Sequence, residues 1–149
     1  MKIFFVTNKK PKSHNSSGSS YHYKESLKTE FEQKYEHLYS GLPIMDRTLQ
    51  AHVVFIHQLT SGNIPDVDNI SKPLVDAFSG KIYSDDNLII RRTADIMKLQ
   101  DFDFVSVDAT NMPIEVLNDF QNYLDNNEKT ILFFEVGEFS SAQIKIGGV

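Results

Sequence analysis

Strand-like and helix-like segments alternate along this chain, and their order constrains the fold more than any single motif does. Apolar residues alternate with polar ones over residues 48–59 (TLQAHVVFIHQL), which predicts a strand. Apolar residues recur at three- and four-residue steps over Lys24–Tyr39, and Gly41 follows as a stop signal, which predicts an amphipathic helix. By the same reasoning we expect further strands at 2–7, 87–99, 103–108 and 131–139, and further helices at 69–79 and 114–124.

This order of segments, without an internal repeat, predicts one domain that spans residues 1–149. We expect the α/β (α+β) class, with a single mixed β-sheet and packed helices. A hydrophobic fraction of 40% over 149 residues is enough for a real core. The chain has no cysteine, which excludes disulfides, thiolate zinc sites, iron–sulfur clusters and thiol catalysis.

Neither a signal-peptide core nor a membrane-span-length apolar run is found in the sequence. With the absence of cysteine, this fits a cytoplasmic protein with no membrane partner. The net charge of −5 is unevenly distributed: residues 1–100 carry a net charge of +2 and residues 101–149 carry −7. The acidity therefore belongs to the last third of the chain.

Five aspartates and one lysine, Lys72, lie in the stretch 65–87 (PDVDNISKPLVDAFSGKIYSDDN). On the expected helix Asp68, Lys72 and Asp76 are four residues apart, so they share one polar stripe opposite the apolar one. Asp66 precedes Asp68 by two residues. Three converging carboxylates would suit Mg²⁺ or Mn²⁺, and a neighbouring lysine would stabilise charge that develops on a phosphodiester.

A purely structural interpretation of the same residues stays open. Asp68 is a candidate N-cap, and Lys72 is a candidate ion-pair partner of Asp68 or Asp76. The pair Asp85 and Asp86 is ordinary loop chemistry. Pro73 lies too far inside a helix that begins at Asn69, so either the first turn is irregular or the helix begins nearer Ser71.

The strings DVDNISKPLVDAF and YSDDNLI together resemble the RusA family of Holliday-junction resolvases, found in bacteria, their phages and prophages. The matching positions occur in the order of the family pattern: Asp66, Asp68, Asn69, Lys72, Asp76, Ala77, Asp85 and Asp86. The resemblance is specific over residues 65–99 and weaker over the segments before them. It implies a homodimeric endodeoxyribonuclease of DNA recombination and repair that binds four-way DNA junctions and cuts them symmetrically with Mg²⁺ or Mn²⁺.

The resemblance also implies roles for individual residues. Asp66, Asp68 and Asp86 would be the metal-binding carboxylates, with Asp85 as the alternative to Asp86. Lys72 would be the catalytic lysine. Asp76 matches the family pattern and is otherwise a candidate helix partner of Lys72. Compared with the family, the last third of the chain is longer and more acidic. We interpret residues 102–128 as an acidic insertion, whose helix adds packing rather than chemistry; weaker DNA binding or contact with another partner is the alternative.

Candidate DNA-binding residues lie in two places. Lys9, Lys10 and Lys12 belong to a Gly/Ser/Asn-rich loop, and Arg91 and Arg92 belong to an expected strand. We expect them to contact phosphates, and solvated surface positions are the alternative. No pair of histidines has convincing metal-ligand spacing. The alternative functions are a DNA-junction or protein-binding module with little or no cleavage, which the acidic last third favours, and a different metal-dependent phosphohydrolase.

Overall fold

The computed structural model describes residues 1–11, 20–60, 64–104 and 106–147, and in these residues four strands form one mixed sheet. The strands are β1 (Ile3–Thr7), β2 (Leu49–His57), β3 (Ile89–Lys98) and β4 (Thr130–Glu138). Their spatial order is β1-β4-β2-β3. The last strand, β4, pairs antiparallel with β1 and β2, and β3 pairs parallel with β2. The predicted α+β class with one mixed sheet is therefore confirmed.

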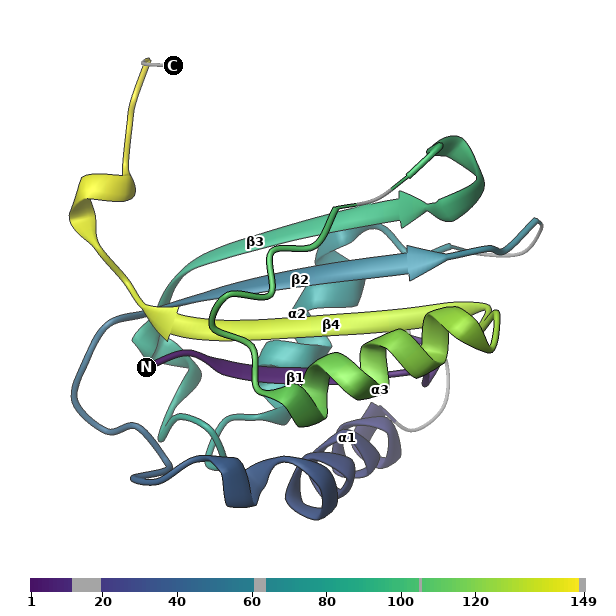
Figure 1. Ribbon diagram of the computed structural model, residues 1–149. Coiled ribbons are helices and arrows are strands. Elements are labelled where there is room, and N and C mark those ends of the chain that lie inside the picture. Colours follow the sequence, from purple (N-terminus) through teal and green to yellow (C-terminus); the bar gives the residue numbers. More distant parts are fainter. Residues whose placement is uncertain (12–19, 61–63, 105, 148–149) are drawn as a thin grey trace.

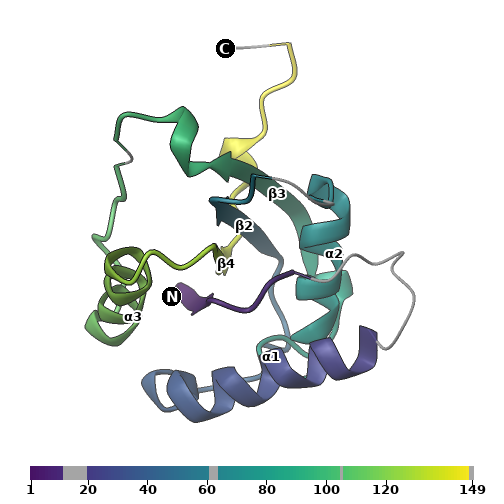
Figure 2. The same ribbon diagram turned by 90° about the vertical axis from the view of Figure 1, so that its right-hand side faces the viewer.

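Three α-helices in the described residues pack against this sheet. They are α1 (Ser20–Lys34), α2 (Val67–Ala77) and α3 (Ile114–Asp125). Figure 1 and Figure 2 show α1 and α2 on one face, and α3 with the segment that precedes it over the other. None of the helices in the described residues is long and apolar enough to cross a membrane.

The main core lies between the sheet and the pair α1–α2, and aromatic rings fill much of it. Phe78, just after α2, lies 5.2 Å from Phe5 of β1, 5.4 Å from Phe134 of β4 and 5.6 Å from Phe31 of α1, measured between ring centroids. All four side chains are fully buried. This cluster fixes the position of α2 on the sheet and thereby the position of the polar stripe that α2 carries.

The alternation predicted for β2 places its two histidines on opposite faces, as expected. Leu49, Ala51, Val53 and Phe55 are buried towards α1 and α2, and His57 is buried at the end of the strand. His52 lies on the other face, where its Nε2 is 2.8 Å from a carboxylate oxygen of Asp95 on β3. An imidazole on each face leaves no paired histidine site on this strand.

Helix and strand boundaries differ from the sequence prediction where a side chain caps the backbone or a 3-10 turn forms. Helix α2 begins at Val67, two residues earlier than predicted, because the Asp66 side chain caps it. Helix α1 covers Ser20–Lys34 instead of Lys24–Tyr39, and a short 3-10 turn at Glu36–Leu38 follows it. Another 3-10 turn, Asp86–Leu88, delays β3 to Ile89.

The strand predicted at 103–108 was wrong. In the described residues of this range the backbone forms no ladder, and residue 105 lies outside the description. The segment crosses over the sheet instead of running along an edge strand (Figure 2), so it has no neighbour for a hydrogen-bond ladder. Phe104 and Val107 of this segment are exposed, at 82% and 45%.

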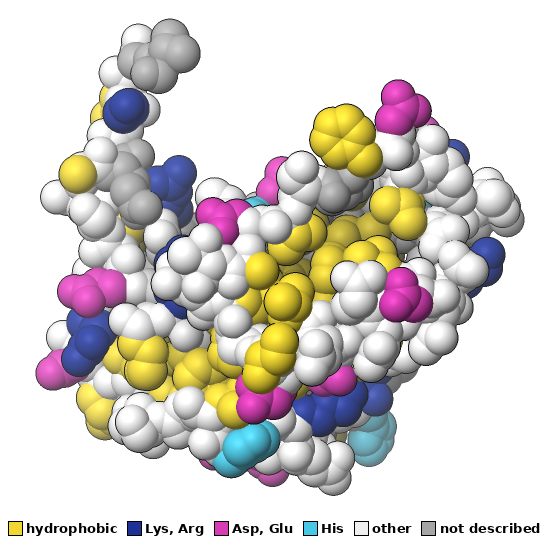
Figure 3. Space-filling model, in the orientation of Figure 1, with side chains coloured by type: hydrophobic (Ala, Val, Ile, Leu, Met, Phe, Trp, Pro, Cys, Tyr) yellow, Lys and Arg dark blue, Asp and Glu magenta, His cyan; other side chains and the backbone are white. Residues whose placement is uncertain are grey.

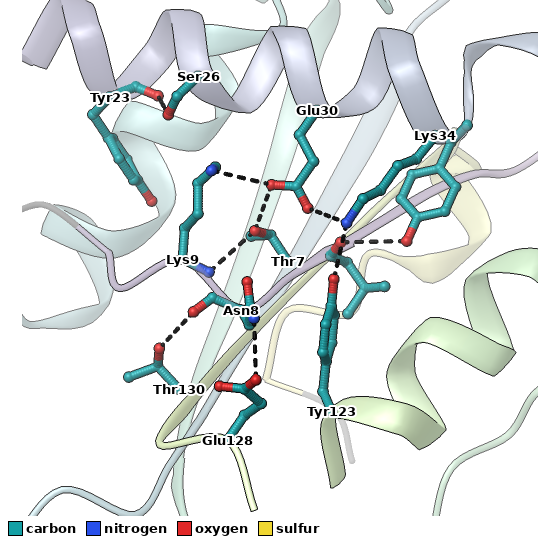
Figure 4. A network of polar contacts seen from close by, with 12 residues as sticks. Thr7, Asn8, Lys9, Tyr23, Ser26, Glu30, Lys34, Tyr123, Glu128 and Thr130 are labelled. Atoms are coloured by element: carbon teal, nitrogen blue, oxygen red, sulfur yellow. Dashed lines mark hydrogen bonds and ion pairs between the residues drawn. The ribbon is translucent and has the colours of Figure 1, made fainter. Parts of the chain in front are cut away.

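Helix α3 is attached to the body through polar contacts as well as through buried Val116 and Phe120. The Tyr35 hydroxyl donates to the Asp119 carboxylate, and the Lys34 ammonium lies 3.1 Å from the Tyr123 hydroxyl oxygen. Figure 4 shows Lys34 beside both Tyr123 and Glu30. In this position α3 packs over β1, away from α2 and β3, which agrees with a packing role. That residues 102–128 are an insertion stays a prediction.

Candidate active site

The aspartate-rich stretch forms a short helix with its own cap. The Asp66 carboxylate accepts a hydrogen bond of 2.9 Å from the Asn69 amide, so Asp66 and not Asp68 is the N-cap of α2. Pro73 lies inside the helix and leaves the Asn69 carbonyl without its usual amide donor. The Ser71 hydroxyl donates to the Val67 carbonyl at 2.8 Å, a bond that often bends helices.

The polar stripe predicted on α2 faces the first half of β3. The Lys72 ammonium lies 3.5 Å from a carboxylate oxygen of Asp76, one turn further along the helix. Arg92 of β3 lies 3.3 Å from a carboxylate oxygen of Asp68. From the other helix, Lys24 of α1 approaches Asp76 to 3.7 Å. Asp76 is thus placed between two lysines that come from different helices.

The paired aspartates before β3 have different surroundings. The Asp85 carboxylate accepts from the Asn87 amide at 2.8 Å and caps the 3-10 turn, and its residue is exposed. Asp86 is half-buried and lies beside the Asp85 and Asp76 carboxyls. Burial first, then the neighbouring Asp85 and Asp76 carboxyls, raises the pKa of the Asp86 carboxyl. Asp86, rather than Asp85, is therefore the carboxyl that faces α2.

Tyr83 fixes the loop that carries these aspartates. Its side chain is fully buried and its hydroxyl donates to the Val75 carbonyl of α2 at 2.5 Å. That carbonyl belongs to the last turn of the helix, where backbone acceptors lack amide donors. The Gly80 amide bonds back to the Tyr83 carbonyl at 2.6 Å, and Gly80 has a φ of +86°, which glycine tolerates best.

A polar pocket of about 290 Å³ opens at this seam between α2 and the start of β3. Its walls are formed by Lys72, Val75, Asp76, Asp86, Ile89, Ile90 and Arg92. It contains two carboxylates and two cationic groups. Such a pocket can bind a cation at its carboxylates and an anionic group beside Lys72 and Arg92.

The structure brings only some of the predicted site residues together. Lys72 and Asp86 line one pocket, whereas Asp68 lies about two helical turns, or about 12 Å, from Asp76 along α2. Asp66 and Asp68 are exposed at the start of the helix. Within the described ranges, no group of three or more His, Asp or Glu side chains is close enough to hold a metal ion. The ligand set Asp66, Asp68 and Asp86 stays a prediction.

Asp76 is the site residue that the sequence analysis underrated. The loop after α2 brings Asp86 to Asp76 rather than to Asp66 and Asp68. Two sequence signals were available, namely its place in the family pattern and its four-residue step from Lys72. Arg92 is a second site residue with a contact that the sequence did not predict, namely its ion pair with Asp68. From the sequence we expected it to contact phosphate.

The donor chemistry at Asp76 and Asp86 fits a hard divalent cation. Two carboxyls that lie this close repel each other when both are ionised, and a cation can relieve that repulsion. Carboxylate oxygens completed by water are the ligands that Mg²⁺ uses in proteins. Asp68, about 12 Å from Asp76 along α2 and paired with Arg92, is too far away to join a set that contains Asp76.

The candidate DNA-binding residues lie at different parts of the surface. Lys9 and Lys10 are exposed after β1, and the Lys9 ammonium is 3.8 Å from Glu30. Arg92 lines the α2–β3 pocket, and Arg91 lines a separate hollow on the opposite sheet face. Lys12 lies outside the described residues. Of the four candidates that the structure describes, Arg92 alone is placed beside the candidate active site.

Comparison with known protein families gives one match. The family model described as "Endodeoxyribonuclease RusA" matches residues 5–107, which is more than half of the chain and includes every residue of the α2–β3 pocket. It ends before α3 and β4. No curated protein matches the chain.

Proposed function

Because the chain belongs to the RusA family of endodeoxyribonucleases, we propose that it resolves four-way (Holliday) DNA junctions by paired, metal-dependent phosphodiester hydrolysis. The observation that carries this proposal is the α2–β3 pocket, where Lys72 lies beside Asp76 and Asp86. A lysine, two carboxyls and an arginine in one open polar pocket suit a reaction at a phosphate group.

The cation would be held by Asp86 and Asp76. The family resemblance offers a second ligand set, which consists of Asp66, Asp68 and Asp86. Mg²⁺ is the expected ion and Mn²⁺ the alternative. When bound, the ion would neutralise charge on the phosphodiester and lower the pKa of a coordinated water. The remaining chemistry has to come from the side chains of the pocket.

Lys72 and Arg92 would act on the phosphate. The Lys72 side chain is 48% exposed, so its ammonium can reach a bound strand while Asp76 keeps it at the pocket. An ammonium there stabilises negative charge that develops on the phosphate or on the leaving oxygen. Arg92 would bind a second phosphate oxygen once it leaves Asp68, because a guanidinium matches phosphate geometry.

The test uses a synthetic four-way junction, a linear duplex of the same sequence, and Mg²⁺ or Mn²⁺. We expect paired cuts in the junction alone, and their loss in Lys72→Ala and in Asp86→Asn. Asp85→Asn is the matched control, because an asparagine oxygen still accepts from the Asn87 amide and the 3-10 turn keeps its cap. Equal losses in Asp85→Asn and Asp86→Asn would contradict the assignment of Asp86.

Cleavage of both opposed strands within one binding event would also support the homodimer that the family resemblance implies. A single uncorrelated nick would oppose it.

Asp68→Asn separates the two ligand sets. If Asp68 binds the ion, cleavage is lost; if Asp68 only holds Arg92, junction affinity changes and the rate at saturating protein stays the same.

A junction-binding module with weak or no cleavage is the second candidate. One specific observation favours it: in the described residues the carboxylates do not form a group of three, and Arg92 already neutralises Asp68. Tight, junction-selective binding without cuts in either ion would establish this alternative. The presence of both Lys72 and Asp86 in one pocket favours the nuclease.

A further inference from the structure

A groove of about 300 Å³ lies on the sheet face that α1 and α2 leave open. Side chains of β1, β2, β3 and β4 form its floor, and the segment before α3 together with α3 forms a wall. The apolar residues that line it are Phe4, Val54, Ile56, Met97, Val107, Met112, Phe120 and Phe133. Figure 3 shows apolar side chains gathered in a hollow on this face.

These apolar groups are only partly covered by the chain itself. Val54, Met97, Met112 and Phe133 are half-buried although they pack on the core. Beside them the segment before α3 exposes Val107 at 45%. Exposed apolar surface costs about 25 cal/mol per Å², and contiguous patches of it usually mark an interaction site.

The charge of the groove restricts what can occupy it. Three carboxylates line it, namely Asp95, Asp108 and Glu135. Lys2 pairs with Glu135 at 2.8 Å and the His52 imidazole lies 2.8 Å from Asp95, and the groove still holds more acidic than basic groups. The chain from residue 101 onwards, which forms α3, the segment before it and β4, carries a net charge of −7. A phosphate backbone is repelled by such a surface, whereas Lys and Arg side chains are attracted to it. The cations of the candidate active site, Lys72 and Arg92, lie at the seam with α2, so the two surfaces are separate.

We propose that this groove is a docking site for a segment of a partner protein that combines apolar and basic side chains. Along β2 the groove runs from His52 to Ile56, about 14 Å at strand spacing. This length holds about nine residues of a helix or about five of an extended chain. The flexible side chains of Met97 and Met112 can adapt to the apolar residues that enter, and the carboxylates bind the basic ones. The proposal does not depend on nuclease activity.

The two groove methionines provide a direct readout. With ¹³C-labelled methionine methyl groups, Met97 and Met112 report on the groove, while Met1 and Met45 are 61% and 66% exposed and line no part of it. The probe is a synthetic twelve-residue amphipathic peptide of leucine and lysine. Its matched control replaces every lysine by glutamate. We expect saturable shifts of Met97 and Met112 with the lysine peptide, and no shifts with the glutamate peptide.

The charge part of the proposal is tested by the double variant Asp95→Asn with Glu135→Gln, which keeps size and removes two charges. The double variant should weaken the binding of the lysine peptide about tenfold. The control Asp46→Asn, at an exposed acid outside the groove, should leave the affinity unchanged. Equal shifts at Met45, equal binding of the two peptides, or unchanged affinity of the double variant would overturn the proposal. So would shifts of Met97 and Met112 on addition of junction DNA, or on raising the protein concentration alone, since nucleic acid or a second copy would then be the occupant.

Discussion

At the scale of single residues, the pair Asp76 and Asp86 is the part of this chain that departs most from ordinary surface chemistry. The three other aspartates of the stretch each have a structural partner: Asp66 caps α2, Asp85 caps a 3-10 turn, and Asp68 pairs with Arg92. Asp76 pairs with Lys72 and Lys24 and also lies beside the Asp86 carboxyl. Two acids that share a site are costly to the fold unless a proton or a cation is present, which is a feature typical of functional sites.

Asp76→Asn should lower the rate of junction cleavage about a hundredfold, because the variant removes a carboxylate that contacts both Lys72 and Asp86. Junction affinity in the absence of divalent ions should change little. The measurement is single-turnover cleavage at saturating protein, together with binding in EDTA. The control for the loss of one carboxylate is Glu25→Gln on α1. The Glu25 carboxylate forms an ion pair with Lys28. If the variant cleaves as fast as the wild type, Asp76 only forms ion pairs and does not contribute to cleavage.

Asp86→Asn should stabilise the metal-free protein while it abolishes cleavage. The pKa of Asp86 is raised in the fold, so the folded chain binds this proton more tightly than the unfolded chain does. Stability therefore falls as the pH rises from the ordinary aspartate value of about 3.9 through the raised value, and stays lower at neutral pH. Asparagine removes that loss, so the variant should melt at a higher temperature than the wild type at neutral pH.

The measurement is thermal unfolding in EDTA at several pH values. The difference between variant and wild type should grow with pH across that window and then level off. Addition of Mg²⁺ should raise the melting temperature of the wild type but not of the variant, because a ligand stabilises only the state that binds it. A variant that is less stable than the wild type in EDTA at neutral pH would show that Asp86 has a favourable structural partner instead.

At the scale of helices and strands, the sequence predicted existence and type well and side-chain placement less well. Strand-forming composition, period-two alternation and helical spacing identified all four strands and all three helices of the described residues. The same signals failed at 103–108, where alternation occurs without a neighbouring strand. Asp76 was underrated because an i, i+4 partner of Lys72 looks the same in sequence whether or not a distant loop returns to it.

Tyr83→Phe tests how the loop with Asp86 is attached to α2. The variant leaves the Val75 carbonyl without its donor in a fully buried place, so it should lower the free energy of unfolding by about 1–3 kcal/mol. Cleavage should also fall, since Asp86 loses its fixed position relative to Lys72. The measurements are denaturant unfolding and cleavage at saturating protein. Tyr21→Phe, an exposed tyrosine on α1, is the control and should alter neither.

The contact between Tyr35 and Asp119 tests how α3 is held. Tyr35→Phe and Asp119→Ala should each destabilise the protein by about 1–3 kcal/mol, and the double variant should cost less than the sum because the two groups form one buried contact. The Asp119 variant should be the milder, since the Tyr35 hydroxyl also lies 3.5 Å from the Val6 carbonyl. Cleavage per folded molecule should not change. A fall in cleavage in the Asp119 variant would show that α3 does more than pack.

At the scale of the whole molecule, the sheet separates two surfaces of different charge. The α2–β3 pocket with Lys72 and Arg92 lies on one side, and the acidic segment with α3 lies over the other. The charge imbalance between residues 1–100 and 101–149 could be read from the sequence. The sequence did not predict that a sheet lies between the two parts. A net charge of −5 is thus compatible with DNA binding, because the acids need not face the DNA.

This separation makes a prediction about salt. Acids on the far side of the sheet are about two layers, or about 20 Å, from DNA bound at α2. The Debye length is about 30 Å at 10 mM salt and about 8 Å at 150 mM. The triple variant Asp103→Asn, Glu115→Gln, Asp125→Asn, all exposed positions, should therefore bind a junction several-fold tighter at 10 mM salt and equally well at 150 mM. Arg92→Gln, at the pocket, should weaken binding at both salt concentrations, because a direct phosphate contact is less screened. If the triple variant were tighter at 150 mM as well, the acids would lie within a few ångströms of the bound strands, and the two surfaces could not be separate.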